Sequence, residues 1–162
     1  MAIRNIRTEE DEILRKHSRE VVKFDSRLHE LLDDMAETMY AAPGVGLAAV
    51  QVGILKRVAV IDDGEGLIEV INGKVVETSG SKIDIEGCLS IPEVYGRVER
   101  PEKVVVNYQD RFGNAKAIEG EGLLAVALCH ELDHFDGILF SDKAIEFLDL
   151  NSMEEGFDDQ QI

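Results

Sequence analysis

Apolar residues recur at helical spacing in an early stretch of the chain. Five of them follow one another at intervals of three, one, three and four residues: Leu28, Leu31, Leu32, Met35 and Met39. This pattern predicts an amphipathic helix that packs one face on a core. Asp25 or Ser26 can cap the beginning of this helix, and Pro43 with Gly44 ends it.

A second helical pattern lies between Leu123 and Phe135 and is apolar over most of its length. Gly120 or Gly122 can open this helix, and Gly137 can end it. One stripe of the helix runs through four residues at spacings of four, three and four: Leu123, Ala127, His130 and His134. Two histidines therefore occupy a stripe that would otherwise belong to the core, where an imidazole needs a polar partner.

Short runs rich in valine and isoleucine fill the middle of the chain and predict strands. They cover residues 57–61, 67–71, 74–78, 81–85, 103–108 and 115–118. Asn72-Gly73 between two of these runs predicts a β-hairpin, and residues 11–18 favour a short helix. No linker divides the chain, so we expect a single domain over residues 1–150 and an acidic, flexible tail over 151–162.

Composition restricts the classes of protein to which the chain can belong. Its 162 residues include 33 acidic and 17 basic side chains, which gives a formal net charge of −16. No basic patch is visible, so we expect no nucleic-acid binding and no docking on anionic lipid. Without a signal-peptide pattern or a membrane-length apolar stretch, we expect a cytoplasmic protein with no membrane contact. The two cysteines form no disulfide framework, so a reduced thiol can serve as a metal ligand.

The run from Cys129 to His134 contains the pattern H-E-x-x-H. On a helix, His130 and His134 share a face, so both imidazoles can reach one metal ion. Glu131 is rotated off that face, which suits a general base that acts on the water activated by the metal. The alternative is a helix with two satisfied core histidines and no metal.

A catalytic site with two histidines is one protein ligand short. Cys88, in the run from Glu86 to Pro92, is the best candidate for the third ligand. Its alternative is a plain buried thiol, the commonest fate of a free cysteine. Cys129 directly precedes His130, so on a helix its side chain points away from the histidine pair, and we expect it to be structural.

The run from Gly44 to Gln51 reads as G-x-G-x-x-A and imitates a dinucleotide-binding fingerprint. That fingerprint must follow a strand and open a helix, whereas this run follows a helix, so we reject the nucleotide interpretation. The glycines instead indicate a backbone that another group approaches closely. Gln51 offers an amide donor at the end of the run.

Three motifs stand in order along the chain: G-V-G-L-A-A-V-Q at 44–51, E-G-C-L-S at 86–90 and H-E-L-D-H at 130–134. Together they resemble the peptide deformylase family, whose motifs G-φ-G-φ-A-A-x-Q, E-G-C-φ-S and H-E-x-D-H they match in full. The resemblance covers nearly the whole chain. It implies an α+β fold in which antiparallel β-strands pack around a central C-terminal helix that carries H-E-x-D-H. It also implies hydrolysis of the N-formyl group from the initiator formyl-methionine of nascent polypeptides, with release of formate.

The resemblance also implies a metal site. Cys88, His130 and His134 would bind one divalent metal ion. In this family the ion in the cell is usually Fe(II), and zinc, nickel or cobalt can take its place. Asp133 is expected to orient a ligand histidine, with helix capping or exposure as its alternative.

Catalytic and substrate-binding roles are carried over from the family in the same way. Glu131 would be the general acid and base, and Gln51 with the backbone N–H of Leu89 would hold the oxyanion. The partner would be an N-formylmethionyl peptide. The positions that contact it would be Val45, Gly46, Gly87, Leu123 and Val126. The apolar members of this set, and Ala127, can equally be ordinary core residues.

Three departures from the family pattern stand out. Cys129 occupies a position that is often glutamine. Tyr95 stands where some members carry an arginine, which leaves contacts to later substrate residues open. Some members end in a basic helix that docks on the ribosome, whereas the tail here is acidic, so a transient ribosome contact by that route is in doubt. Glu86 is expected to pair with Arg100 near the site.

Two other functions are compatible with parts of this sequence. A zinc endopeptidase could combine H-E-x-x-H with Glu146 or Glu154 as the third ligand, and it would keep its metal after Cys88→Ser. A catalytically dead relative retained as a binding module would be expected to lack Glu131 or a ligand. This chain has Glu131 and all three ligand residues, Cys88, His130 and His134, which argues against such a relative.

Overall fold

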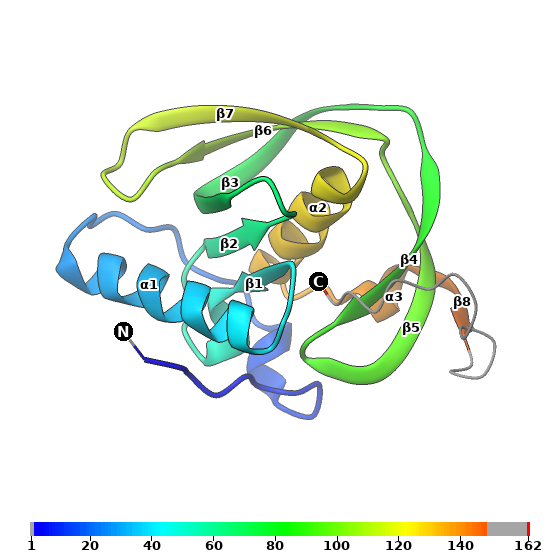
Figure 1. Cartoon of the computed structure of the whole chain (residues 1–162), viewed down its shortest axis with the longest axis horizontal. Coiled ribbons are helices and arrows are strands. Elements are labelled where there is room, and N and C mark those ends of the chain that lie inside the picture. Colours follow the sequence, from blue (N-terminus) through cyan, green and yellow to red (C-terminus); the bar gives the residue numbers. More distant parts are fainter. Residues whose placement is uncertain (1, 149–161) are drawn as a thin grey trace.

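We describe residues 2–148 and 162 of a computed structural model of the chain. Helix α2 (Leu123–Phe135) lies near the centre of the molecule, and helix α1 (Ser26–Ala41) lies on one flank (Figure 1). Two antiparallel sheets surround α2, so the α+β fold expected from the sequence is confirmed.

Both long helices begin and end near the expected residues. The carboxylate of Asp25 accepts a hydrogen bond from the Leu28 N–H at 3.2 Å and caps α1, and all five apolar residues of the predicted stripe are buried. Gly122 precedes α2 with a φ of 61°, and Gly137 follows it with a φ of 74°. The short helix expected at 11–18 is a single 3-10 turn, η1 (Glu12–Arg15).

The larger sheet has the strand order β1-β2-β3-β6-β7. Its strands are β1 (Gly46–Ala48), β2 (Val58–Asp62), β3 (Leu67–Ser79), β6 (Lys103–Gln109) and β7 (Ala115–Glu121). The run from Gly44 to Gln51, for which no strand was predicted, contains β1 and most of a 3-10 turn, η2 (Ala49–Val52). One face of this sheet packs on α2, and α1 covers β1 and β2 from the other side (Figure 1).

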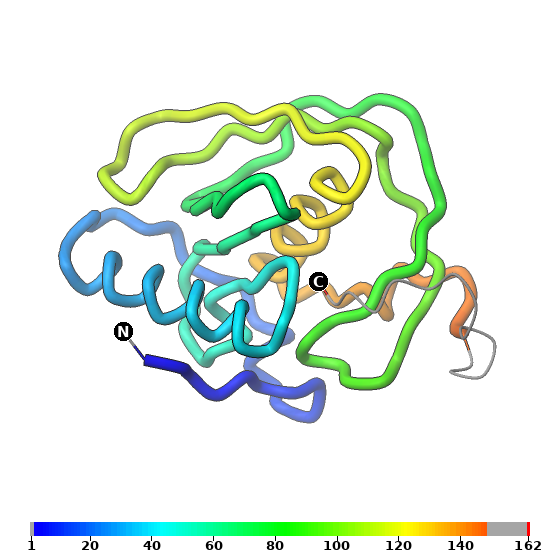
Figure 2. The backbone as a smooth tube through the Cα atoms, viewed as in Figure 1, coloured from blue at the N-terminus to red at the C-terminus, as the bar shows by residue number. Residues whose placement is uncertain are grey.

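The smaller sheet has the order β4-β5-β8. It consists of β4 (Lys82–Cys88), β5 (Ile91–Arg100) and β8 (Ala144–Leu148), and helix α3 (Phe140–Lys143) leads into β8. Strands β5 and β8 were not predicted, because Pro92 and the charged residues of both runs obscure any apolar alternation. The β4–β5 hairpin brings the second motif against the C-terminal half of α2 (Figure 2).

The hairpin predicted at Asn72-Gly73 is wrong. Strand β3 continues through this dipeptide, and the register to β6 shifts between Ile71 and Lys74. Asn72 has a φ of 55°, and its side-chain amide exchanges two hydrogen bonds of 2.8 Å with the backbone of Val21. The dipeptide therefore makes a bulge that holds a distant segment, and it does not reverse the chain.

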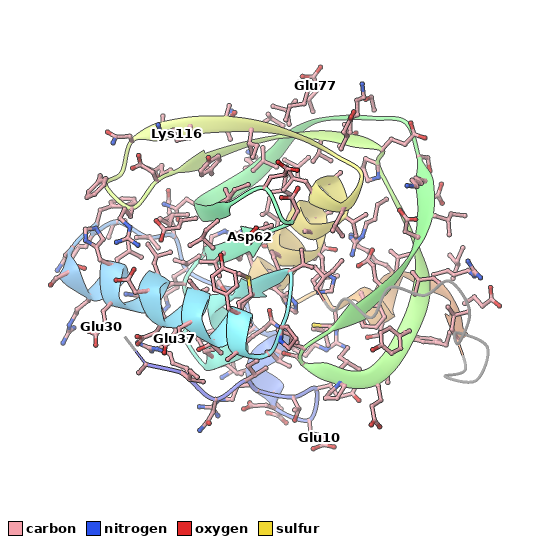
Figure 3. The ribbon with its side chains drawn as sticks, in the orientation of Figure 1. Glu10, Glu30, Glu37, Asp62, Glu77 and Lys116 are labelled. Atoms are coloured by element: carbon pink, nitrogen blue, oxygen red, sulfur yellow. The ribbon has the colours of Figure 1, made fainter. Side chains whose placement is uncertain are left out.

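Two apolar clusters form the core. One surrounds α2 and contains Val45, Cys88, Ile91, Val126 and Phe135, and the other lies between α1 and β1–β2. Acidic side chains such as Glu10, Glu30 and Glu77 lie at the periphery (Figure 3). These acidic side chains thus lie on the surface, away from the α2 core.

No helix among the described residues is long and apolar enough to cross a membrane. The acidic tail expected at 151–162 lies outside the described residues except for Ile162. The domain boundary expected near residue 150 falls in the same stretch and stays a prediction.

Candidate metal and active site

Three side chains that lie far apart in the sequence meet at the centre of the fold. Cys88 is the last residue of β4, and His130 and His134 lie one turn apart on α2. The ligand atoms of the three residues lie within 4.8 Å of one another, and Cys88 Sγ is 3.6 Å from His134 Nε2. All three residues are buried, with at most 1% of their surface exposed. The structure therefore brings together the ligand set expected from the sequence.

The chemistry of these donors fits a metal ion. The Nε2 atom of His130 is buried without a hydrogen-bond partner among the described residues. Burial alone would lower the pKa of His130, but the neighbouring Cys88 and Glu86 raise it well above its usual value. The pKa of His134 is instead held well below its usual value by burial and by the charge of His130. An orphaned imidazole nitrogen beside a thiol and a second imidazole is what a divalent cation would satisfy. Three protein ligands also leave a fourth position for water or substrate.

Glu86 fixes the orientation of His130. One oxygen of the Glu86 carboxylate lies 2.9 Å from His130 Nδ1, and the other accepts a hydrogen bond from Arg100 Nε at 2.8 Å. Burial would raise the pKa of Glu86, but its bonds to His130 and Arg100 lower it to about 2. A carboxylate held on Nδ1 turns Nε2 of the same ring toward the metal position.

Asp133 does not take the role that the sequence suggested. Its carboxylate accepts hydrogen bonds from Arg100 Nη1 at 2.7 Å and from Lys143 Nζ at 3.2 Å, and it orients no ligand histidine. The expected pairing of Glu86 with Arg100 is confirmed by two hydrogen bonds. Asp133 therefore acts through Arg100, one step further from the metal position than expected.

Glu131 follows His130 on α2 and is fully buried. Neither of its carboxylate oxygens has a hydrogen-bond partner among the described residues, and burial raises its pKa to about 7. Gly46 leaves the room for this carboxylate, since a Cβ at Gly46 would lie 2.5 Å from Glu131 Oε2. The close approach that the glycine pattern indicated is thus the approach of Glu131 to β1.

Gln51 and Leu89 lie beside Cys88. The Gln51 side-chain amide donates to Ser90 Oγ at 3.0 Å and approaches Cys88 Sγ at 3.6 Å, while its oxygen accepts from the Ala48 N–H at 2.9 Å. These contacts fix the amide with one N–H directed toward the thiol. Leu89 and Ser90 form the two-residue turn between β4 and β5. The role of Ser90 in holding Gln51 was missed, although Ser90 belongs to the second motif.

The expected substrate-contacting residues are only partly gathered at the site. Val45, Gly46, Gly87 and Val126 are buried, whereas Leu123 at the first turn of α2 is 37% exposed. Val45 and Val126 belong to the same apolar cluster as Cys88. The structure thus supports a buried apolar wall beside the thiol, with Leu123 nearer the surface.

Cys129 lies on the other side of α2, as expected. It lines a cavity of about 810 Å³ together with Arg100, Leu132, Asp133 and Lys143. Burial raises the pKa of its thiol to about 11. Glu146 was one of the two third ligands considered for a zinc endopeptidase. It pairs with Arg97 on the surface, and 61% of its side chain is exposed, so it is excluded as a third ligand of this metal site.

Comparison with known proteins agrees with this site. The family model described as polypeptide deformylase matches residues 3–148. The chain belongs to this family. A peptide deformylase from Caldicellulosiruptor bescii is 62% identical over 96% of this chain and 93% of its own length, and one from Acetivibrio thermocellus is 63% identical over 95% and 91%. The crystal structure of the peptide deformylase from Thermotoga maritima superposes with a TM-score of 0.87 at 41% identity, covering 89% of this chain and 99% of that one.

Family membership establishes the activity at the level of the reaction. The chain is a hydrolase that deformylates nascent peptides in a metal-dependent reaction. The Cys88, His130 and His134 cluster supplies the metal-binding triad that this activity requires.

Proposed function

We propose that Cys88, His130 and His134 ligate one Fe(II) ion in the cell. A donor set of one thiolate and two imidazoles suits iron, zinc, nickel and cobalt, and the usual ion of the family decides among them. When bound, the ion polarises the substrate carbonyl and lowers the pKa of water. The orphaned Nε2 of His130 is the single observation that carries the proposal of a bound metal ion.

Glu131 moves the proton. Its buried carboxylate lies beside the triad with both oxygens free of protein partners, so it can accept a proton from the attacking water. A pKa of about 7 also lets the protonated form deliver that proton to the leaving amine near neutral pH. General acid and base are therefore the same residue at two stages of the reaction.

Gln51 and the Leu89 N–H hold the oxyanion of the tetrahedral intermediate. The bonds of Gln51 to Ala48 and Ser90 fix its amide before substrate arrives, so no reorganisation is needed at the moment of reaction. Leu89 directly follows Cys88, so its backbone N–H would lie next to the carbonyl of a substrate bound at the metal. Removal of one such donor typically lowers kcat about 10²–10³-fold.

The substrate class is an N-formylmethionyl peptide. Val45 and Val126 supply apolar surface for the methionine side chain, Leu123 closes the outer end, and Gly46 and Gly87 present backbone to the peptide. Because the substrate is a nascent polypeptide, we further propose a cytoplasmic location and a transient encounter with the ribosome.

Formate release tests this proposal directly. The protein is purified without oxygen, loaded with Fe(II) and assayed with a formyl-Met-Ala-Ser tripeptide beside Glu131→Ala. We expect rapid release by the wild type and a loss of about 10²–10⁴-fold in the variant, because general acid–base catalysis contributes that much. The metal content of the variant, measured by atomic absorption, should be unchanged.

Two outcomes would overturn the assignment. Metal-loaded wild type that releases no formate would remove the deformylase role of this site. A Cys88→Ser variant that keeps its metal would favour the zinc-endopeptidase interpretation, in which a residue other than Cys88 is the third ligand.

A further inference from the structure

Ile162 lies inside the molecule, although it stands 14 positions after Leu148, the last residue of β8. Its side chain is only 3% exposed and belongs to the apolar cluster of Val45, Cys88 and Val126. Its backbone N–H donates to the carbonyl of Gly87 at 3.3 Å. Figure 2 shows this end of the chain near α2, in the middle of the fold.

Gly87 is a suitable partner for an incoming peptide. The β4–β5 register shifts between Glu86 and Cys88, so Glu86 faces Gly96, Cys88 faces Ile91, and Gly87 faces no residue of β5. A carbonyl left outside a ladder can pair with an added extended segment, which is how a strand edge recognises a peptide. Ile162 makes this contact one residue away from the ligand Cys88.

We propose that Ile162 docks beside Gly87, where the substrate peptide would bind, and competes there with substrate. The inference rests on the proposed function, because Gly87, Val45 and Val126 are the residues that would receive the formyl peptide. Ile162 presents a backbone N–H to Gly87 and adds an aliphatic side chain to the apolar cluster that contains Val45 and Val126. A methionyl peptide would offer the same two features.

The connection does not prevent this docking. Fourteen peptide steps separate Leu148 from Ile162, and an extended chain of that length spans roughly 45–50 Å. A group on the same chain can reach an effective concentration in the millimolar range at a site that it is able to reach. Occupancy that begins to compete with substrate therefore requires only weak intrinsic binding.

Substitution of Ile162 by aspartate tests the competition. We expect Ile162→Asp to lower the KM for formyl-Met-Ala-Ser about 3–10-fold while kcat stays the same, because a tethered competitor raises KM alone. Ile162→Leu keeps an aliphatic side chain and should behave as the wild type. Ile145→Asp makes the same chemical change at a side chain that is 61% exposed on β8, and its KM should not move.

A binding measurement separates this inference from the proposed function. Isothermal titration calorimetry with the deformylated tripeptide Met-Ala-Ser requires no turnover, and its Kd should tighten by the same 3–10-fold in Ile162→Asp. Equal Kd values in both proteins would overturn the competition, whether or not the enzyme is active. Tighter binding without any formate release would keep the competition and reject the proposed function. A lower melting temperature with unchanged Kd and KM would make Ile162 a structural residue only.

Discussion

Two buried carboxylates near His130, those of Glu86 and Glu131, differ in their hydrogen-bond partners and in their pKa. Glu86 is held by Arg100 and by His130 Nδ1, and these bonds keep its pKa near 2. Glu131 is equally buried, but neither of its oxygens has a partner among the described residues, and its pKa is raised to about 7. Burial is the same for both side chains, so the partners account for the difference in pKa.

This difference in pKa assigns different roles to the two residues: Glu86 orients a ligand histidine, and Glu131 transfers a proton. A carboxylate that stays charged at every physiological pH can fix an imidazole, but it cannot exchange a proton with substrate. A carboxylate that titrates near neutral pH can do so, and its unsatisfied oxygens leave room for water.

Removing the charge of Glu86 should have the largest effect on stability. Glu86→Gln leaves the buried Arg100 with Asp133 as its remaining carboxylate, and breaking a buried pair costs about 3–5 kcal/mol. Loss of this carboxylate should also weaken metal affinity about 10–100-fold. Urea unfolding of the metal-free protein and competition with a chelator measure the two effects.

Lys143→Gln is the matched control for this prediction. Lys143 also contacts the network through Asp133, but 44% of its side chain is exposed, so its loss should cost less than about 1 kcal/mol. If Glu86→Gln and Lys143→Gln destabilised the protein equally, the contrast between the two carboxylates would lose its energetic basis.

The two carboxylates should give opposite pH dependences of stability. The folded-state pKa of Glu131 is raised from 4.5 to about 7, so the folded protein keeps a proton that the unfolded chain releases, and stability falls as pH rises from 4.5 to 7. The 2.5-unit difference corresponds to about 3 kcal/mol. Glu86, lowered to about 2, instead loses its contribution as pH falls from 4.5 toward 2.

Metal-free wild type and Glu131→Gln, unfolded in urea at several pH values, isolate the first of these effects. The stability of the wild type relative to the variant should decrease by about 3 kcal/mol between pH 4.5 and 7, and contributions common to both proteins cancel. A difference that stays constant across this range would mean that Glu131 titrates normally and is not the poised acid and base.

The metal centre could be predicted from the sequence because its ligands are recognised from short-range spacing and from short motifs. The i, i+4 spacing of His130 and His134 fixes their shared face on any helix, and Cys88 was the only other well-placed thiol. The N-cap at Asp25 and the glycine at 137 were predictable for the same reason, because a helix end depends on a few neighbouring residues.

The errors concern contacts between residues far apart in the chain. Asn72-Gly73 has the local chemistry of a hairpin, but its amide bonds to Val21 and Gln109, 51 and 37 residues away, keep the strand continuous. Asp133 was chosen to orient a histidine because it is close in sequence, whereas Glu86, 44 residues from His130, does so in the fold. Sequence distance alone could not reveal either partner.

The smallest expected effect on stability comes from Gly46→Ala, which tests how closely Glu131 is held. In Gly46→Ala the new Cβ would lie 2.5 Å from Glu131 Oε2, and since the carboxylate ends a flexible side chain it can swing aside at little cost in stability. Displacement by about 1 Å should lower kcat about 10²-fold, with metal content and melting temperature close to the wild type. Gly80→Ala is the control, because its Cβ would likewise meet a carboxylate oxygen, Glu102 Oε2 at 2.8 Å, away from the site residues; its φ of 70° adds backbone strain, but its kcat should not change. A Gly46→Ala enzyme with full activity would show that the room beside β1 is not needed to place Glu131, and the free carboxylate would then owe its position to α2 alone.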